Sequence, residues 1–454
     1  MLADALISLL GPEKVSTAQD ILETHSIDKW HASNLPEAVV FAESTEDVAK
    51  TLQYANEHNI PVTTRGAGVG YVGGCVPTRG GIALSVMRMN KILDLAPMDG
   101  VAVVQPGVIT GELQAAAREI GWYYPPDPAS LKECSIGGNI ATNAGGPRCL
   151  KYGVTRSYVL GLEVVLADGR VMRTGGRNHK NKTGFDLVGL MTGSEGLLGV
   201  VTEATLRIIP HPPTRSMVSA TFDTFADAAR AVQEILGGGI LPSALEITDG
   251  FTLEAARNYL GRDALPAGDA HLIVELDGQV ESVAREIQQL ADRVRELGAV
   301  GLNIAQSDEE CEAVWQLRRG FSYSLRATGL TKLNEDIVVP RSKLVELVAF
   351  AREIEADTGI AVACFGHAGD GNIHTNLMVD NYDDPEEKVK ADAAVDQLFR
   401  WVIANGGAIT GEHGVGIAKR QWFADAVGET SYAVHKQLKA ALDPNGILNP
   451  DKVL

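Results

Sequence analysis

One stretch of the chain decides how the rest is interpreted. It reads Cys134-Ser135-Ile136-Gly137-Gly138-Asn139-Ile140-Ala141-Thr142-Asn143-Ala144-Gly145-Gly146. Residues this small leave little to pack into a core, and they suit a backbone that lies flat along a large planar ligand. Immediately upstream stands the rigid segment Pro125-Pro126-Asp127-Pro128. We therefore expect residues 125–153 to form a ligand-binding loop region.

Further upstream, Gly68-Val69-Gly70-Tyr71-Val72-Gly73 matches the GxGxxG pattern of dinucleotide-binding folds. That pattern is meaningful only where a helix opens at the glycines. Here Pro77 and Gly80-Gly81 leave no room for a helix before the strand expected at Ile82, which argues against NAD(P). Two interpretations remain for residues 65–70: a plain tight turn, or a loop whose N–H groups surround a pyrophosphate.

Downstream, a third small-residue segment reads Gly193-Ser194-Glu195-Gly196-Leu197-Leu198-Gly199 and continues to Glu203. Taken together, the three segments resemble the FAD-binding oxidoreductases of the vanillyl-alcohol oxidase (PCMH) type. Within that family the chain is most similar to glycolate oxidase FAD subunits and to D-lactate and D-2-hydroxyglutarate dehydrogenases. The resemblance covers nearly the whole chain, in order, and continues into the C-terminal half.

This resemblance implies an α+β fold, with a two-subdomain PCMH-type FAD-binding domain, a ferredoxin-like substrate cap domain and a C-terminal helical segment. It also implies that FAD lies between the first two loops. Some members tether the flavin through a histidine in the first loop; this loop has none, so we expect non-covalent FAD. The residues expected to contact FAD are Arg65, Gly66, Ala67, Gly68, Val69, Gly70, Pro126, Asp127, Ser130, Cys134, Gly137, Gly138, Asn139, Ala141, Thr142, Asn143, Gly145, Gly146, Tyr152, Gly153, Val201 and Asn449.

The best candidate for a domain boundary is His211-Pro212-Pro213. It divides the chain into an FAD-binding domain, residues 1–213, and a substrate or cap domain with a metal site, residues 214–454. Beyond the boundary, a strand–helix–strand pattern occurs twice, over residues 217–247 and 271–304. That order is typical of ferredoxin-like domains.

Two histidines flank a turn in Cys364-Phe365-Gly366-His367-Ala368-Gly369-Asp370-Gly371-Asn372-Ile373-His374. A two-residue turn at Asp370-Gly371 would pair His367 directly with His374. Cross-strand Cβ atoms are then roughly 4.5–5.5 Å apart, close enough to share a divalent metal. The alternative is a surface hairpin with two unrelated histidines.

Glu412-His413 could add a third, carboxylate ligand and a free base. Two histidines and one carboxylate leave coordination positions open, as a catalytic metal site requires. The spacing is not HExxH, so a zinc protease is not supported. The resemblance implies that His367, His374 and Glu412 bind a divalent metal (Zn, Mn or Fe) and that His413 is the base.

Recognition of a substrate carboxylate favours a guanidinium, whose geometry matches it. Arg318 and Lys332 match family positions for this role, with Ser322 as a lesser candidate; the alternative for Arg318 is a solvated helix face. We expect FAD-dependent oxidation of a small (D-)2-hydroxy acid, such as glycolate or D-lactate. The chain has no CxxC pair for an iron–sulfur cluster, so its electrons need an external acceptor, such as an iron–sulfur partner subunit.

Bulk composition excludes some classes of protein. The formal net charge of −18 argues against a nucleic-acid partner. Met1–Leu10 lacks the features of a signal peptide, and no run approaches the ~18 apolar residues of a membrane span. The five scattered cysteines indicate a cytoplasmic protein, and both a homodimer and attachment to the inner membrane through partner subunits are compatible with this. Two rivals remain: a non-redox flavoenzyme like the alkyl-glycerone-phosphate synthases, and a metal-dependent hydrolase.

Overall fold

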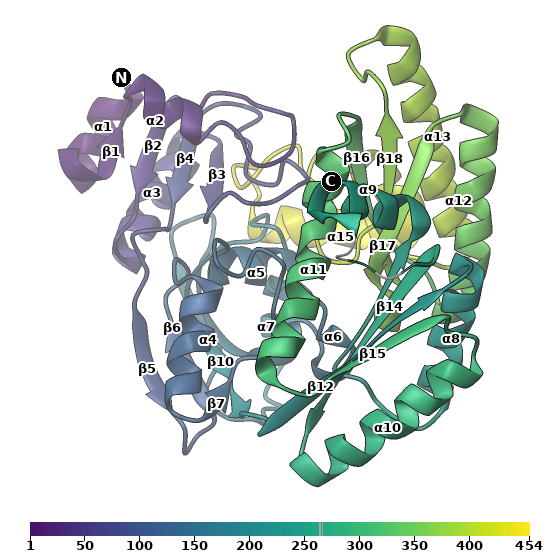
Figure 1. Cartoon of the computed structure of the whole chain (residues 1–454). Helices are drawn as coiled ribbons and strands as arrows, with labels where there is room; N and C mark the ends of the chain where they lie inside the picture. The colour runs from purple at the N-terminus through teal and green to yellow at the C-terminus, as the bar shows by residue number, and fades with distance from the viewer. Residues whose placement is uncertain (263–264, 266) are drawn as a thin grey trace. The chain divides into compact units, whose positions relative to one another are not determined.

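The chain forms two units in this computed structural model, which describes residues 1–262, 265 and 267–454 (Figure 1). Unit 1 comprises Met1–Gly145, Gly153–His211 and Glu412–Leu454. Unit 2 comprises Gly146–Tyr152 and Pro212–Gly411. The crossing after His211 lies two residues from the boundary expected after Pro213. The linear division nevertheless differs from the spatial one, because residues 412–454 pack in unit 1 and a short segment of the glycine-rich region packs in unit 2.

Unit 2 is built on one seven-stranded sheet with the strand order β15-β12-β14-β13-β17-β18-β16. Its strands β12 to β15, with helices α8 and α10, follow the expected ferredoxin-like order. The hairpin β17–β18 and strand β16 extend the sheet beyond β13. The elements are α6 (Cys149–Tyr152), β12 (Thr214–Phe222), α8 (Phe225–Gly237), β13 (Ala244–Asp249), α9 (Gly250–Leu260), β14 (Ala270–Gly278), α10 (Val280–Glu296), β15 (Gly301–Ala305), α11 (Asp308–Arg326), β16 (Thr331–Val338), α12 (Leu344–Thr358), β17 (Ala361–His367), β18 (Asn372–Val379) and α13 (Pro385–Ala404).

The two faces of this sheet have different chemistry. Side chains alternate along a strand and register partners share a face, so the strand pairing places many polar residues on one side. They are Ser219, His271, Glu275, Glu246, His367, His374, Asn376 and Lys332. Helices α9 and α11 pack on this polar face, where Ala255 and Leu325 contact Phe365. The histidines, the lysine and the Arg318 helix of the predicted site therefore meet on one side of one sheet.

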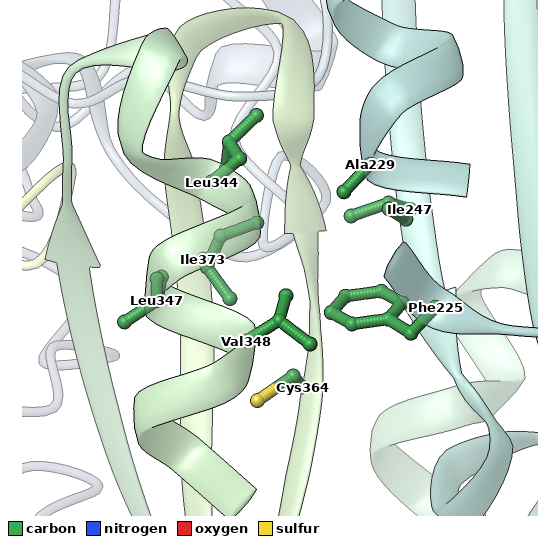
Figure 2. A pocket seen from close by; sticks show the side chains of 8 residues that line it. All are labelled: Phe225, Ala229, Ile247, Leu344, Leu347, Val348, Cys364 and Ile373. Atoms are coloured by element: carbon green, nitrogen blue, oxygen red, sulfur yellow. The ribbon is translucent and has the colours of Figure 1, made fainter. Parts of the chain in front are cut away.

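The opposite face is apolar and packs against α8 and α12. A small void there is lined by side chains from both helices and three strands, with the Cys364 sulfur among them (Figure 2). The lining residues are Phe225, Ala229, Ile247, Leu344, Leu347, Val348, Cys364 and Ile373. A lining without charged or amide groups offers nothing to orient a polar substrate. We therefore assign this void to packing.

Unit 1 contains a four-stranded sheet, β1-β2-β4-β3, and a five-stranded antiparallel sheet, β5-β6-β10-β8-β9. Its elements are α1 (Leu2–Leu10), β1 (Val15–Ser16), α2 (Gln19–Thr24), β2 (Ala38–Phe41), α3 (Thr45–His58), β3 (Val62–Arg65), β4 (Ile82–Ser85), β5 (Ile92–Ala96), β6 (Val101–Val104), α4 (Thr110–Glu119), β7 (Trp122–Tyr123), α5 (Ile136–Thr142), β8 (Val159–Val165), β9 (Val171–Gly175), α7 (Leu187–Met191), β10 (Val200–Arg207), β11 (Ile209–Pro210), α14 (Arg420–Val427) and α15 (Glu429–Leu442).

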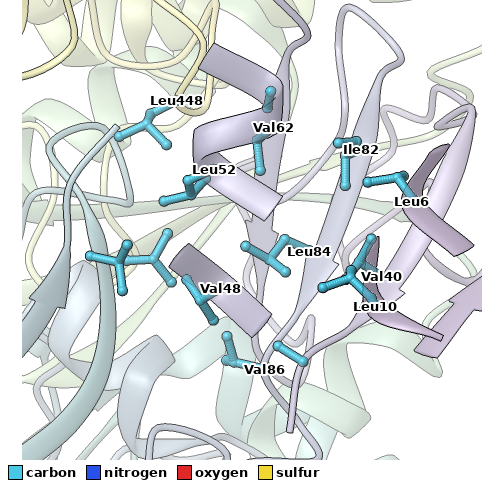
Figure 3. Close-up of a cluster of buried hydrophobic side chains, with 14 of the residues drawn as sticks. Leu6, Leu10, Val40, Val48, Leu52, Val62, Ile82, Leu84, Val86 and Leu448 are labelled. Carbon is cyan, nitrogen blue, oxygen red and sulfur yellow. The ribbon is translucent and has the colours of Figure 1, made fainter. Parts of the chain in front are cut away.

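The core of unit 1 explains why the C-terminal segment belongs to it. Helix α3, capped by Ser44, presents Val48 and Leu52 to strand β4 (Figure 3). Leu448 packs into the same cluster with no exposed surface. Burial of such a side chain contributes about 1.5–3 kcal/mol. Two backbone hydrogen bonds of 2.8 Å join Val62 to Ile447 and Asn449, which continue the packing of this segment beside β3.

Within the described residues, no helix combines the length and the apolar character that a membrane span requires.

Candidate active site

The first glycine loop leaves strand β3 at Arg65 and forms no helix before β4. The helix that an NAD(P)-binding GxGxxG motif opens is therefore not formed here, as predicted. Arg65 is buried and turned into the protein, where it donates to the Ile27 carbonyl and lies 3.2 Å from Cys75 Sγ. Gly66 lies against the second loop so closely that an added Cβ would be 2.4 Å from Ser135 Oγ. The first two loops are therefore in contact.

The second loop contains a short helix, α5, which differs from the flat backbone expected there. The Ser135 hydroxyl caps this helix by accepting from the Gly138 N–H at 3.4 Å. Asn139 is buried and donates to Thr110 Oγ1 at 2.6 Å. The helix ends at Asn143, whose φ of 52° is left-handed. We missed it because glycine lowers helix propensity, whereas packing and the cap decide the outcome.

Asn449 ties the third loop to the first. Its amide donates to the carbonyl of Gly74 at 2.9 Å and to that of Glu195 at 2.7 Å. Its Oδ1 is buried and has no hydrogen-bond partner among the described residues. Such an atom suits a ligand that can donate to it. The loops of unit 1 thus form a cradle of backbone and amide groups that fits FAD.

The C-terminal segment closes around the third loop at Glu195. The Glu195 carboxylate accepts the N–H groups of Val415 and Gly416, both at 2.8 Å, and its burial raises its pKa. Of the residues expected to contact FAD, all lie in unit 1 except Gly146 and Tyr152. Tyr152 donates to Asp277 Oδ2 at 2.8 Å within unit 2.

We expect Gly416→Ala to weaken FAD binding by about tenfold or more. The added Cβ would lie 2.2 Å from the Val72 carbonyl in the first loop. Overpacking of this kind costs about 1–3 kcal/mol, and 1.4 kcal/mol corresponds to about tenfold in affinity. Gly446→Ala is the matched control, since its φ of 63° is also left-handed but nothing lies within 4 Å. FAD titration of both variants measures the difference; equal affinities would contradict the prediction.

The histidine hairpin differs from its predicted register. Strands β17 and β18 are joined by Ala368–Gly371, four residues rather than two, so His374 pairs with Phe365 and His367 pairs with Asn372. The expected direct pairing of His367 with His374 is therefore wrong. A shift of two residues preserves the face on which each side chain lies. The two imidazole rings consequently still meet, with centroids 5.8 Å apart.

Asp336 explains how the third predicted ligand reaches the histidines. It is the register partner of His374 on β16, and its Oδ2 accepts Thr410 Oγ1 and the Gly411 N–H, both at 2.9 Å. Gly411 ends unit 2 and Glu412 is joined to it by a peptide bond. The ligand atoms of His367, His374 and Glu412 all lie within 4.8 Å of one another. Two imidazoles and one carboxylate fit a divalent transition metal.

Glu246 on β13 is a site residue that our sequence reasoning missed. It is 1% exposed. Its Oε1 accepts from His367 Nδ1 at 2.5 Å, and its Oε2 accepts from Arg318 Nε at 2.7 Å. Burial alone would raise its pKa, but His367 and Arg318 outweigh that effect and lower the pKa to about 2.

Arg318 lies inside the structure, and the alternative of a solvated helix face is wrong. Its side chain is 11% exposed, and its guanidinium lies over the Phe365 ring at 4.8 Å from the centroid. On strand β16, Lys332 donates at 2.9 Å to Oγ of Ser322, a residue of the same helix as Arg318. Burial, followed by Arg326 and Arg318, lowers the Lys332 pKa to about 8. Among the described residues, no carboxylate forms an ion pair with Lys332, which leaves this cation available to an anion.

His413 follows the last predicted metal ligand. Its Nε2 lies 4.0 Å from Glu412 Oε1, and its ring lies 5.4 Å from that of Tyr71 in the first glycine loop. The side chain is 16% exposed. A partly exposed imidazole can exchange protons with solvent.

Comparison with protein families accounts for both units. A model described as the C-terminal domain of FAD linked oxidases matches residues 211–453, and an FAD binding domain model matches residues 36–175. The chain is a member of the FAD-linked oxidases. Its predicted family is thereby confirmed, and this FAD-linked oxidase is a flavoprotein oxidoreductase that binds FAD.

Relatives of this FAD-linked oxidase extend over almost its full length. A glycolate oxidase subunit GlcD of Bacillus subtilis is 38% identical over 451 residues, with coverage of 99% of this chain and 96% of the relative. A D-lactate dehydrogenase of Anaerostipes hadrus is 34% identical, with coverage of 98% and 95%.

Solved structures confirm the PCMH-type fold of this FAD-linked oxidase. p-Cresol methylhydroxylase matches with a TM-score of 0.81 at 22% identity, covering all of this chain and 96% of that one. An alkyldihydroxyacetonephosphate synthase, the predicted non-redox rival, matches with a TM-score of 0.75 at 20% identity, covering 99% and 84%. Since these likenesses concern the fold alone, the relatives of higher identity carry more weight on function, and they do not favour the rival.

Proposed function

We propose that this FAD-linked oxidase converts a small 2-hydroxy acid, glycolate or D-lactate, into the 2-oxo acid. The observation that carries the proposal is the polar sheet face, where His367 and His374 lie beside the half-buried cations Arg318 and Lys332. A 2-hydroxy acid presents a hydroxyl and a carboxylate on adjacent carbons, and such a face offers groups for both. The names of the relatives, glycolate oxidase subunit and D-lactate dehydrogenase, agree with this substrate class.

The protein's own residues have separate tasks. Arg318, helped by Lys332, binds the carboxylate through charge-assisted hydrogen bonds. His413 takes the proton of the hydroxyl as general base. His367, His374 and Glu412 would hold a divalent metal (Zn, Mn or Fe), which supplies Lewis acidity toward the hydroxyl. The glycine loops would hold FAD without a covalent link, and the flavin would supply hydride-accepting chemistry toward the carbinol carbon.

The two electrons then leave for an external acceptor. A quinone, a cytochrome, an electron-transfer flavoprotein or an iron–sulfur partner subunit would serve, and the name of the GlcD relative as a subunit favours a partner chain. The five cysteines are all free thiols, which agrees with a cytoplasmic site of action. Peripheral attachment through partner subunits and a homodimer are further parts of this proposal.

The test is an absorbance spectrum of the purified protein before and after anaerobic addition of glycolate or D-lactate. We expect a flavin spectrum that bleaches with at least one of the two. A flavin spectrum that neither acid bleaches in metal-loaded protein would overturn the substrate class. The faster of the two acids identifies the better substrate.

Substrate binding is expected to weaken as pH rises through about 8. The Lys332 pKa is lowered to about 8, so the side chain is a charged ammonium below this pH and loses its charge above it. KM should therefore increase between pH 7 and 9 while the carboxylate of the substrate stays ionised throughout. Steady-state kinetics of wild type and Lys332→Met test this, because the variant should have a higher and pH-independent KM. The same pH profile in both would contradict the role of Lys332.

A further inference from the structure

One buried carboxylate connects the two halves of the proposed substrate site. Glu246 lies in the middle of the polar face of unit 2, on β13 between β14 and β17. Each of its oxygens has a different partner: Oε1 accepts from His367 Nδ1 and Oε2 accepts from Arg318 Nε. The single side chain of Glu246 therefore joins His367, a candidate metal ligand, to Arg318, the proposed binder of the substrate carboxylate.

The hydrogen bond to His367 determines which nitrogen of the ring can bind a cation. A carboxylate oxygen that already faces Arg318 acts as the acceptor, so the short contact between Glu246 Oε1 and His367 Nδ1 places the ring proton on Nδ1. The lone pair of a neutral imidazole is then on Nε2. A carboxylate behind a ligating histidine fixes the tautomer and the ring orientation in this way, and its loss typically costs about 10–100-fold in metal affinity.

The second hydrogen bond determines how Arg318 is presented. Glu246 accepts the Nε–H of the Arg318 guanidinium, and the central carbon of the guanidinium lies over the Phe365 ring at 4.8 Å from the ring centroid. A guanidinium held along one edge and on one face has little rotational freedom. The remaining Nη groups keep the fork that matches a carboxylate.

We propose that Glu246 is a positioning residue that sets the His367 tautomer for the metal and the Arg318 orientation for the substrate carboxylate, and so couples the two. This inference rests on the proposed function. It predicts that loss of the Glu246 carboxylate weakens metal binding and carboxylate binding together, although Glu246 touches neither ligand.

The informative variant is Glu246→Gln, which keeps the size of the side chain. A Gln carbonyl that accepts from Arg318 turns its NH₂ toward His367 Nδ1, which must then accept, and the ring proton moves to Nε2. Glu275→Gln is the matched control. Glu275 lies on the same sheet face, is fully buried, and pairs with Arg148 at 2.7 Å and with Trp315 Nε1 at 2.7 Å. The Glu275→Gln variant therefore breaks a buried ion pair, as Glu246→Gln does, but at a residue that is not in contact with His367.

Two binding measurements on FAD-loaded protein decide the matter without turnover. Titration of metal-free protein with Zn²⁺ should give a Kd raised about 10–100-fold in Glu246→Gln and unchanged in Glu275→Gln. Titration of the Zn²⁺-loaded proteins with oxalate, an unreactive carboxylate, should show the same order. Glu246→Asp, which retains an ionised carboxylate, should recover part of both affinities.

The possible results separate the inference from the proposed function. Unchanged Zn²⁺ affinity in Glu246→Gln, with wild type that binds Zn²⁺ and is bleached by substrate, would overturn the role of Glu246 alone. Wild type that binds no divalent metal would overturn both. Should Glu246→Gln not fold, ¹⁵N spectra of histidine-labelled wild type remain decisive: a proton on Nδ1 of His367 supports the inference, and a proton on Nε2 alone overturns it.

Discussion

Replacement of His413 by glutamine is expected to slow substrate-driven bleaching of the flavin by about 10²–10⁴-fold, the usual contribution of a general base. Glutamine retains hydrogen bonding but cannot accept a proton at neutral pH. FAD content should remain that of wild type, because glutamine is close in size to histidine and keeps hydrogen-bonding groups beside Tyr71. Anaerobic stopped-flow absorbance with glycolate or D-lactate measures the rate.

The control for this variant is His435→Gln. His435 lies on α15 in the same unit, and its Nδ1 donates to the Ser431 carbonyl at 2.7 Å. Its loss should leave the bleaching rate unchanged. Normal bleaching in His413→Gln would remove His413 from the role of base. A loss of FAD from that variant would instead assign His413 to the cradle.

Replacement of His374 by alanine should remove the metal and slow flavin reduction on the order of 10³-fold, since Lewis-acid stabilisation of several kcal/mol is lost. One of three converging ligands disappears, while the glycine loops of unit 1 are untouched. The protein should therefore remain yellow. Metal content by elemental analysis and the rate of anaerobic bleaching are the two measurements, and treatment of wild type with a chelator should reproduce both effects.

His271→Gln is the matched control for this second variant. His271 is a buried histidine on the same sheet face, hydrogen-bonded to Ser219 Oγ at 2.7 Å, and burial lowers its pKa to about 4. Its replacement should lower stability without loss of metal. A His374→Ala protein that is still bleached at the wild-type rate would contradict a catalytic metal at this site.

Much of this architecture could be predicted from local patterns. The capping box at Ser44 and Asp47 marks the start of α3, and the alternation of strands and helices after Pro213 indicates the ferredoxin-like half. The predicted metal ligands were also brought together despite an error in register. That error was harmless because it involved two residues, so His374 stayed on the same face of the sheet.

Other features could not be read from local sequence, for identifiable reasons. Helix α5 contains Gly137 and Gly138, so propensity argues against it, and its formation depends on a cap and on tertiary contacts. Glu246 lies 121 residues before His367, in a strand whose other residues are buried. Nothing in the adjacent sequence distinguishes it from a glutamate that forms an ordinary buried salt bridge. The pairing of β13 with β17 brings Glu246 to His367, and pairing at that separation leaves no local signal.

The four places where the chain passes from one unit to the other also bear on how the gene could be divided. A fragment that ends at residue 213 would encode unit 1 without Leu448, Asn449 and the partners of Glu195, and it would leave a hydrophobic gap beside β3. A fragment that begins at residue 214 would lack Arg148, the counter-ion of the buried Glu275. Recombination between relatives at residue 213 would therefore build each unit from segments of two different parents. Exchange of a whole unit between relatives requires breakpoints in pairs. The exchanged segment must begin and end at two crossings between the units, so that the chain returns to the unit it left.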